Sequence, residues 1–153
     1  MTTVLAPVAG HVVGLAGVPD PVFSGGLVGP GTAIDPARRA GEALAPIDGL
    51  ILKLHPHAYV IAGEDGRAVL VHLGIDTVLL KGEGFRPLAC EGARVRAGAP
   101  VVAWDPVAVA SAGKSPICPV VALDARPGTL TTLLAAGPVR AGEELFRWGG
   151  GYD

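Results

Sequence analysis

Short apolar runs alternate with turn residues along the whole chain. The runs are rich in Val, Ile and Leu, recur about every 8–12 residues, and are broken by Gly, Pro and Asp. This spacing is typical of an all-β sandwich or barrel. We expect strands over residues 10–15, 49–54, 59–62, 69–73, 100–104, 119–123 and 144–148.

Helical signals are few. Asp105 followed by Pro106 has the form of an N-cap and a first helical residue, and Gly113 is a plausible end for that helix. Residues 129–136 are expected to form a second short helix, and residues 35–40 a single turn. The pattern therefore predicts an all-β fold with one or two short helices.

Two pairs of segments resemble each other. Residues 5–13 (LAPVAGHVV) and 44–52 (LAPIDGLIL) each carry an Ala-Pro-x-x-Gly turn before an apolar strand. Residues 95–98 and 139–142 share the sequence Val-Arg-Ala-Gly, and each leads to a tryptophan. A sheet built from duplicated hairpin elements would produce these repeats.

Histidines concentrate in one predicted hairpin. Three of the four in the chain are His55, His57 and His72. Residues 57–61 and 67–73 are predicted strands because β-branched and apolar residues dominate both. Between them, Gly63-Glu64-Asp65-Gly66 has the composition of a tight turn.

The register of this hairpin decides whether two histidines meet. If Glu64 and Asp65 form the centre of the turn, His57 lies directly opposite His72, with Cβ atoms about 5 Å apart. Tyr59 and Leu70 are then the next pair on that face. A slip of one residue would place the two histidines on opposite faces of the sheet.

A pair of imidazoles is compatible with three roles. A structural role is disfavoured because His72 interrupts an otherwise apolar strand. A zinc site could use His55, His57 and His72, although Pro56 interrupts the strand between the first two. As a nucleophile, neutral imidazole can attack phosphorus, and the second ring can hydrogen-bond the phosphoryl oxygens.

The residues that follow His72 favour the nucleophile. Gly74 ends the strand, and a backbone carbonyl there could accept a proton from Nδ1 of His72, leaving Nε2 free. The chain has no Walker-type glycine loop, so a phosphoryl donor would have to be another molecule. By composition alone, Asp20 and Asp76 are ordinary turn residues.

Composition excludes several classes of protein. The 153 residues suit one domain, predicted over 1–148, with residues 149–153 as a flexible C-terminal tail. Lys plus Arg number 12 against 14 Asp plus Glu, with no basic stripe that would favour nucleic acid. No targeting or membrane-spanning run is present, so a soluble cytoplasmic protein is expected. Cys90 and Cys118 are expected to be free thiols.

The stretch from Gly66 to Val78, G-x-x-V-L-V-H-L-G-I-x-T-V, closely resembles the phosphorylation-site signature of the glucose-type enzyme IIA (EIIA) family. These proteins belong to the bacterial phosphoenolpyruvate-dependent sugar phosphotransferase system. The similarity extends over residues 4–148, including residues 18–23 and 45–49. The sequence around His55 and that of residues 113–119 are most similar to the actinobacterial branch.

The resemblance implies a flattened antiparallel sandwich with both histidines in a shallow depression. It implies that His72 accepts a phosphoryl group at Nε2 from the phosphohistidine of the carrier protein HPr. A cysteine of a sugar-specific IIB domain then receives the group, with His57 assisting that transfer. No cofactor is required, although some family members place zinc between the two histidines when a partner supplies a carboxylate.

The resemblance also assigns supporting residues. Partner contacts are implied at Asp20, Val22, Phe23, Asp76 and Val78, and orienting roles at Gly74 and His55. His55 is a departure, because enterobacterial members commonly have threonine at this position. Leu70 and Leu73 are further departures, since they stand where phenylalanines are common.

The alternative function is a zinc-dependent hydrolase of the barrel-sandwich type, such as a peptidoglycan peptidase with a His-x-His motif. His55, His57 and His72 would be its metal ligands. Such enzymes need an upstream His-x-x-x-Asp motif, and His11 is not followed by aspartate at that spacing.

Overall fold

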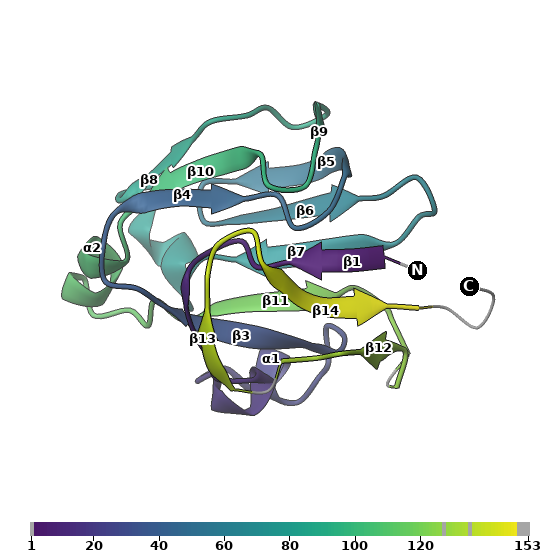
Figure 1. The fold of residues 1–153 in the computed structure, drawn as a ribbon. Helices are drawn as coiled ribbons and strands as arrows, with labels where there is room; N and C mark the ends of the chain where they lie inside the picture. Colours follow the sequence, from purple (N-terminus) through teal and green to yellow (C-terminus); the bar gives the residue numbers. More distant parts are fainter. Residues whose placement is uncertain (1, 127, 135, 150–153) are drawn as a thin grey trace.

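The computed structural model describes residues 2–126, 128–134 and 136–149. Over these residues the strands form three antiparallel sheets, one large and two small (Figure 1). In spatial order the large sheet contains β13 (Gly137–Val139), β2 (Gly10–Val12), β3 (Gly31–Pro36), β11 (Cys118–Ala122), β7 (Ala68–His72), β6 (Ala58–Ala62), β5 (Gly49–His55) and β9 (Arg94–Val95).

The two small sheets lie side by side against one face of the large sheet (Figure 1). One contains β1 (Thr2–Leu5), β14 (Glu144–Trp148) and β12 (Leu130–Thr131). The other contains β4 (Gly41–Leu44), β10 (Pro100–Trp104) and β8 (Phe85–Pro87). The expected flattened antiparallel sandwich is confirmed.

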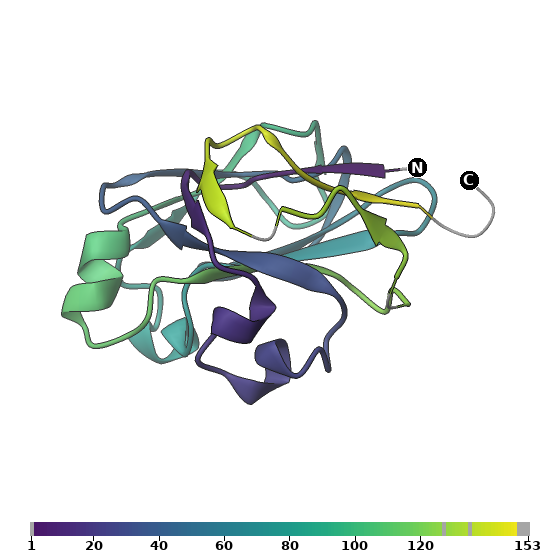
Figure 2. The ribbon, with the colours of Figure 1, turned by 60° about the horizontal axis from the view of Figure 1, so that its bottom comes forward.

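Four short helical segments gather on one side of the described sandwich (Figure 2). They are the 3-10 helices η1 (Leu15–Gly17) and η2 (Thr77–Leu80) and the α-helices α1 (Pro21–Ser24) and α2 (Pro106–Ser111). The start of α2 is as predicted, because the Asp105 side chain accepts a hydrogen bond from Val107 N at 3.0 Å. None of the described helices is long and apolar enough to cross a membrane.

Two helical predictions are wrong. Within the segment 129–136, Leu130 and Thr131 form β12, which pairs with the edge of β14, and residue 135 lies outside the described residues. Strand pairing there outweighs a weak local helical preference. In the segment 35–40, Asp35 and Pro36 complete β3, and no helical turn forms.

The repeated segments occupy equivalent places in the fold. β1 pairs with β14 in the same register as β4 pairs with β10. The matched pairs are Thr2–Trp148 with Gly41–Trp104, and Leu5–Glu144 with Leu44–Pro100. The two units are also linked reciprocally by the hydrogen bonds Leu5 N to Pro46 O (2.9 Å) and Leu44 N to Pro7 O (3.0 Å).

Steric crowding explains why each Ala-Pro-x-x-Gly turn ends in glycine. A Cβ atom on Gly10 would lie 2.1 Å from the Asp35 carbonyl oxygen. A Cβ atom on Gly49 would lie 2.1 Å from the corresponding oxygen of Ala62. Both turns therefore bring the backbone against a neighbouring strand at a distance that only glycine permits.

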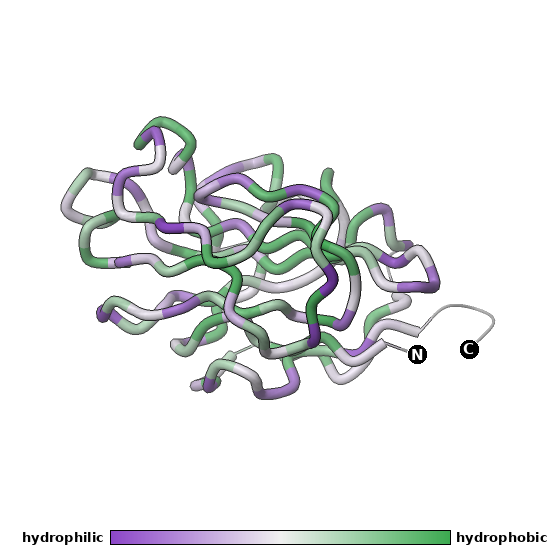
Figure 3. The backbone as a smooth tube through the Cα atoms, turned by 90° about the horizontal axis from the view of Figure 1, so that it is seen from above, coloured by the Kyte–Doolittle hydropathy of each residue, from purple (hydrophilic) through white to green (hydrophobic). Residues whose placement is uncertain are grey.

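The large sheet buries its inner face and part of its outer face. Its inner face and the small sheets enclose the main core, which includes Tyr59, Val71, Val101 and Phe146. The buried part of its outer face packs beneath η1 and α1 through a second cluster, which contains Val18, Phe23, Ala33, Ile75 and Val121. The alternation of hydrophobic and hydrophilic positions along the backbone is visible in Figure 3.

The histidine hairpin has a different register from the one predicted. Ala58, rather than His57, lies opposite His72, and Tyr59 lies opposite Val71 rather than Leu70. The turn contains three residues, 64–66, because Gly63 N donates to Arg67 O at 2.8 Å. Gly66 has a left-handed φ of 83°, which is the usual way such a turn is closed. The extra residue shifts every cross-strand pair by one position.

Replacing Gly66 by alanine should lower the free energy of unfolding by about 1 kcal/mol, because an L side chain disfavours the left-handed conformation. No atom lies within 4 Å of the position that a Cβ would occupy on Gly66, so the backbone alone produces the loss. Urea denaturation of Gly66→Ala measures it. Gly41→Ala, which is equally uncrowded but lacks a left-handed φ, should lose no stability. Equal stability of Gly66→Ala and the wild type would contradict the turn assignment.

Candidate functional site

His72 is the last residue of β7, and its ring lies on the outer face of the large sheet. Nδ1 is within hydrogen-bond distance of the Gly74 carbonyl oxygen. Because a carbonyl only accepts, Nδ1 must carry the ring proton, and Nε2 keeps its lone pair. Gly74 has a φ of 83°. A Cβ there would lie 2.6 Å from Thr77 Cγ2 and 2.9 Å from Ser115 O, so glycine is required at this bend.

His57 lies in the two-residue turn between β5 and β6, after Pro56. Its carbonyl oxygen accepts a hydrogen bond from Leu73 N at 2.7 Å, which ties the turn to the end of β7. The ring centroids of His57 and His72 are 5.2 Å apart, with an angle of 68° between the ring planes. The one-residue slip therefore does not separate the rings, because His57 is outside the ladder where side chains alternate between faces.

Two further rings extend this contact into a row, which we call the ring row: Phe23, His72, His57 and His55. Phe23 packs edge-on against His72 with centroids 5.4 Å apart. His55 stacks on His57 with centroids 5.7 Å apart and planes at 24°. Phe23 is buried, His72 and His57 are partly buried, and His55 is exposed. The row thus runs from the interior to the surface.

The surroundings keep both central imidazoles neutral. Burial lowers the pKa of His57 to about 4, and the neighbouring imidazoles of His72 and His55 add to this effect. Burial also lowers the pKa of His72. The Gly74 hydrogen bond and the carboxylates of Asp20 and Asp76 act in the opposite direction and limit that shift. At neutral pH both rings therefore retain a nitrogen lone pair.

The surface near the ring row has apolar side chains from three helical segments. We call this surface the rim: Val22 on α1 (46% exposed), Val78 and Leu79 on η2 (59% and 63%), and Val107 on α2 (43%). Leu79 and Val107 are not among the residues predicted from the sequence. The run Val-Leu-Leu after Thr77 was a usable signal for Leu79, because a solvated turn would not need it.

Two carboxylates lie beside the ring row. Asp20 caps α1, where its Oδ1 accepts a hydrogen bond from Val22 N at 2.9 Å. Asp76 precedes η2 with a left-handed φ of 58° and makes no side-chain capping bond. Phe23 was predicted to contact a partner, whereas its 8% exposure and its contact with His72 make it mainly a wall of the site.

The described residues contain no group of three or more His, Cys, Asp or Glu side chains arranged to hold a metal ion. His55 stacks its ring against His57 instead of converging with His57 and His72 on one point. The zinc hydrolase alternative is therefore not supported. Both cysteines are free, Cys90 at the surface and Cys118 in the interior.

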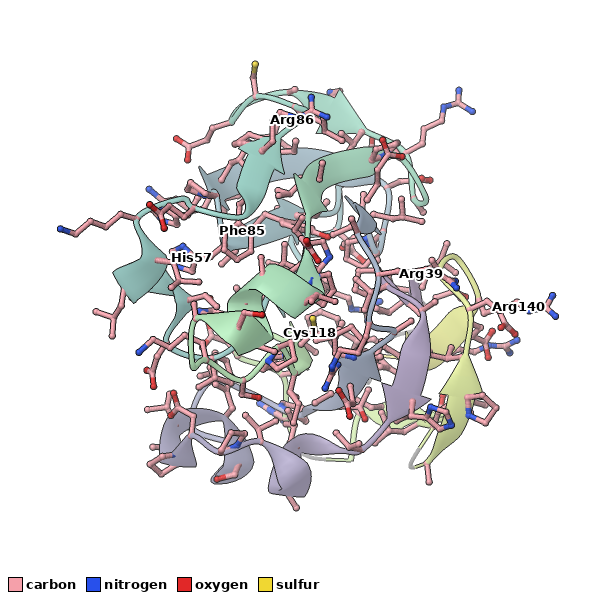
Figure 4. All side chains as sticks on the ribbon, turned by 90° about the vertical axis from the view of Figure 1, so that its left-hand side faces the viewer. Arg39, His57, Phe85, Arg86, Cys118 and Arg140 are labelled. Carbon is pink, nitrogen blue, oxygen red and sulfur yellow. The ribbon has the colours of Figure 1, made fainter. Side chains whose placement is uncertain are left out.

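Figure 4 faces the end of the molecule that carries α2. His57 lies there beside η2, and Cys118 lies next to α2. The labelled arginines, Arg39, Arg86 and Arg140, lie away from His57 in this view, so the site has no arginine of its own among them. The arrangement offers a neutral nucleophile, a neighbouring imidazole, two carboxylates and an apolar rim.

Comparison with known proteins gives one consistent result. The family model described as "phosphoenolpyruvate-dependent sugar phosphotransferase system, EIIA 1" matches residues 2–127. A glucose-specific EIIA component from Bacillus cereus is 40% identical over 121 residues, which cover 78% of this chain and 72% of the relative. The solved structure of glucose permease IIA from Mycoplasma capricolum has a TM-score of 0.85 and 32% identity, covering 94% of this chain and 93% of that chain.

Some similar proteins are much longer. A glucose-specific EIIBCA component from Corynebacterium glutamicum is 37% identical over 125 residues. These residues cover 82% of this chain and only 18% of that protein. The similar region is therefore also found joined to other components in one polypeptide.

Acid should destabilise the fold through His57 and His72. Their folded-state pKa values lie below about 6.5, the value of an unfolded histidine, so between about pH 6.5 and 4 the unfolded state binds more protons. Their contribution to stability should be complete above about pH 6.5 and should be lost as the pH falls through that window.

Chemical denaturation of the wild type and of His57→Gln at about pH 7 and about pH 4.5 measures this effect. His57→Gln should lose less stability between the two pH values. His11→Gln, which removes an exposed histidine on β2 outside the ring row, is the control. Identical losses in all three proteins would show that the ring row does not titrate as described.

Proposed function

The chain belongs to the EIIA 1 family of the phosphoenolpyruvate-dependent sugar phosphotransferase system and is a phosphocarrier component of that system, and we propose that Nε2 of His72 carries the phosphoryl group. The observation that carries this proposal is the contact between His72 Nδ1 and Gly74 O. It leaves Nε2 as the nucleophilic nitrogen of a neutral imidazole. His72 also lies within the stretch that resembles the family's phosphorylation signature.

The proposed transfer is a direct displacement at phosphorus. The Nε2 lone pair of His72 forms a bond to the phosphorus of a phosphohistidine on HPr. The bond from phosphorus to the donor nitrogen breaks, and its electron pair stays with the donor imidazole. The ring of His72 gains positive charge in this step, and the Gly74 carbonyl at Nδ1 stabilises that charge.

The second transfer reverses the roles. A cysteine thiolate of a IIB domain attacks the same phosphorus, and the electron pair of the broken bond returns to Nε2 of His72. The joined EIIBCA architecture of the Corynebacterium relative supports a IIB domain and a membrane permease as partners. HPr as the donor follows from the family resemblance.

His57 is proposed to assist the second transfer. Its neutral ring has one N–H group that can donate to a phosphoryl oxygen on His72, at a ring separation of 5.2 Å. A dianionic phosphoryl group would raise the pKa of His57, so that the ring could take up a proton and offset the negative charge. His55, stacked on the other side, limits the orientations that the His57 ring can adopt.

Partner proteins are proposed to dock on the rim. Exposed apolar side chains beside a reactive group are typical of a protein interface, whose centre is apolar and whose edge is polar. Asp20 and Asp76 would pair with basic side chains of the donor. Val22 and Val78 would supply apolar contact area, with Phe23 supporting His72 from behind.

No cofactor is needed for these steps. Zinc could bind between His57 and His72 only in a complex, because two imidazoles are half of a tetrahedral set and a partner carboxylate would have to contribute. A cytoplasmic location follows from the proposed exchange with HPr. The actinobacterial assignment stays a prediction, since the Bacillus and Corynebacterium relatives are similar to this chain by nearly the same identity, 40% and 37%.

Substitution of His72 and substitution of His57 should affect different transfers. With phosphoenolpyruvate, enzyme I and HPr, the wild type should acquire one phosphoryl group that is labile to acid and stable to alkali. His72→Gln should acquire none, because the amide nitrogen of glutamine has no basic lone pair with which to attack phosphorus. His57→Gln should be labelled but should pass the group to a IIB domain about a hundredfold more slowly, the size expected for loss of a general acid.

Phosphoryl labelling followed by intact mass spectrometry gives the first measurement, and a chase with purified IIB domain gives the second. Labelling of His72→Gln would refute the assignment of the acceptor. Unchanged transfer from His57→Gln would remove His57 from the mechanism. His11→Gln, a substitution on β2, should behave as the wild type in both steps.

A charge on the rim should slow the first transfer. Leu79→Asp should reduce the rate of labelling by HPr about tenfold, because an unpaired carboxylate would be buried in an apolar contact. Labelling rates at several HPr concentrations measure it. Leu133→Asp, on an exposed leucine (43%) between β12 and β13, is the matched control and should have no effect. Equal rates for the two variants would place the docking surface elsewhere.

A further inference from the structure

The peptide group between Gly74 and Ile75 makes hydrogen bonds in opposite directions. Its carbonyl oxygen, on Gly74, accepts from Nδ1 of His72. Its amide, on Ile75, donates to the carbonyl oxygen of Ser115 at 2.8 Å. A trans peptide group is planar, with its C=O and N–H pointing in opposite directions. The position of Ser115 O therefore fixes the direction in which the Gly74 carbonyl points.

The peptide group before Gly74 is held separately. The carbonyl oxygen of Leu73 accepts a hydrogen bond from the hydroxyl of Thr77 at 2.9 Å. Both residues are fully buried, with 0% of each exposed. Thr77 also crowds Gly74, because its Cγ2 lies 2.6 Å from the position a Cβ would occupy there. The hydroxyl and the methyl group of Thr77 thus both restrict the bend after His72.

A buried thiol completes the support. Cys118, at the start of β11, is fully buried, and burial raises the pKa of its thiol to about 12. A hydrogen bond with the Gly74 backbone acts against that rise. Cys118 is thus a neutral thiol against the bend, and its Sγ lies 3.3 Å from the Pro116 carbonyl oxygen. Residues 115–118 and Thr77 therefore hold the bend from two sides.

We propose that Thr77 is a positioning residue for phosphoryl transfer, acting with Ser115 and Cys118 to fix the Gly74 carbonyl and thereby the tautomer of His72. We call these three residues the Gly74 clamp. This inference rests on the proposed role of His72 as the phosphoryl acceptor. Thr77 does not touch the reacting atoms, and its effect passes through the backbone of residues 73–75.

The clamp has a chemical consequence during transfer. Positive charge develops on the His72 ring as Nε2 bonds to phosphorus, and part of it resides at the Nδ1 proton. A carbonyl dipole that already points at this proton stabilises the charge without reorganising. The Ser115 carbonyl, the Ile75–Gly74 peptide group and the His72 ring also form a chain of hydrogen bonds, in which each bond polarises the next.

Removing the Thr77 hydroxyl should release this geometry. Thr77→Val keeps the shape of the side chain but leaves the buried Leu73 carbonyl oxygen without its donor. The bend can then relax to find another partner, and the Gly74 carbonyl loses its fixed direction. His72 can place its proton on Nε2 in that case, and this tautomer has no lone pair on the nitrogen that attacks.

The experiment compares Thr77→Val with Thr77→Ser, which retains the hydroxyl. Nitrogen-15 NMR of the His72 ring reports which nitrogen carries the proton. The measurement is made at about pH 7.5, where the lowered pKa values of His57 and His72 leave both rings neutral. Labelling by HPr reports the rate. Thr77→Val should show a larger fraction of the Nε2–H tautomer and about tenfold slower labelling, and Thr77→Ser should match the wild type in both.

A merely structural role for Thr77 predicts a different result. Thr77→Val would then be less stable to urea but would keep the wild-type tautomer and labelling rate, and this outcome overturns the proposal. If Thr77→Val does not fold, Ser115→Ala serves instead, because the Ser115 hydroxyl accepts from Ile117 N at 3.3 Å and shapes the turn that presents the Ser115 carbonyl. The same tautomer shift in Ser115→Ala supports the clamp, and an unchanged tautomer and rate overturn it.

Failure of the clamp can be told apart from failure of the proposed function. His72→Gln is the test of the acceptor itself and should remain unlabelled in every case. If His72→Gln stays unlabelled and Thr77→Val keeps the wild-type tautomer and labelling rate, only the clamp is refuted. A labelled His72→Gln refutes the acceptor assignment and the clamp with it.

Discussion

The hydrogen bond between His72 Nδ1 and the Gly74 carbonyl oxygen is the interaction on which the proposed chemistry of this protein depends. It decides which ring nitrogen carries the proton, and so which nitrogen can attack. The bond requires a sharp bend directly after β7, and that bend requires the left-handed φ that Gly74 adopts. The Gly74 clamp then restrains this bend through buried contacts with its backbone. Those contacts fix the direction of the Gly74 carbonyl group.

The ring row keeps two imidazoles neutral while leaving them partly exposed. Phe23 shields one side of His72, while His57 and His55 extend the row to the surface. Burial and mutual repulsion hold the pKa of His57 at about 4, whereas Asp20 and Asp76 moderate the shift at His72. The two histidines are thereby unequal, in agreement with the proposal that His72 accepts the phosphoryl group and His57 assists its departure.

The duplicated hairpins form a frame that is nearly symmetric, but the site is not. β1 with β14 and β4 with β10 share one register, and Gly10 and Gly49 pack against equivalent carbonyl groups. The helical segments break this symmetry, because they lie together on one side of the described sandwich (Figure 2). Three of them carry the exposed apolar side chains of the rim, which is the face proposed for docking of partner proteins.

The sequence by itself determined the strand spacing, the duplicated turns, the Asp105 cap of α2 and the contact of His72 with a backbone carbonyl just after its strand. Each of these depends on local pattern or on what a single residue type permits. Three features depended on tertiary structure. Residues 130 and 131 became a strand because β14 offered an unpaired edge. The left-handed Gly66 moved the hairpin register, which no alternation of apolar residues reveals. His57 still meets His72, because the turn after Pro56 and the bond from Leu73 N to His57 O place it outside the ladder, and only the folded chain fixes that geometry.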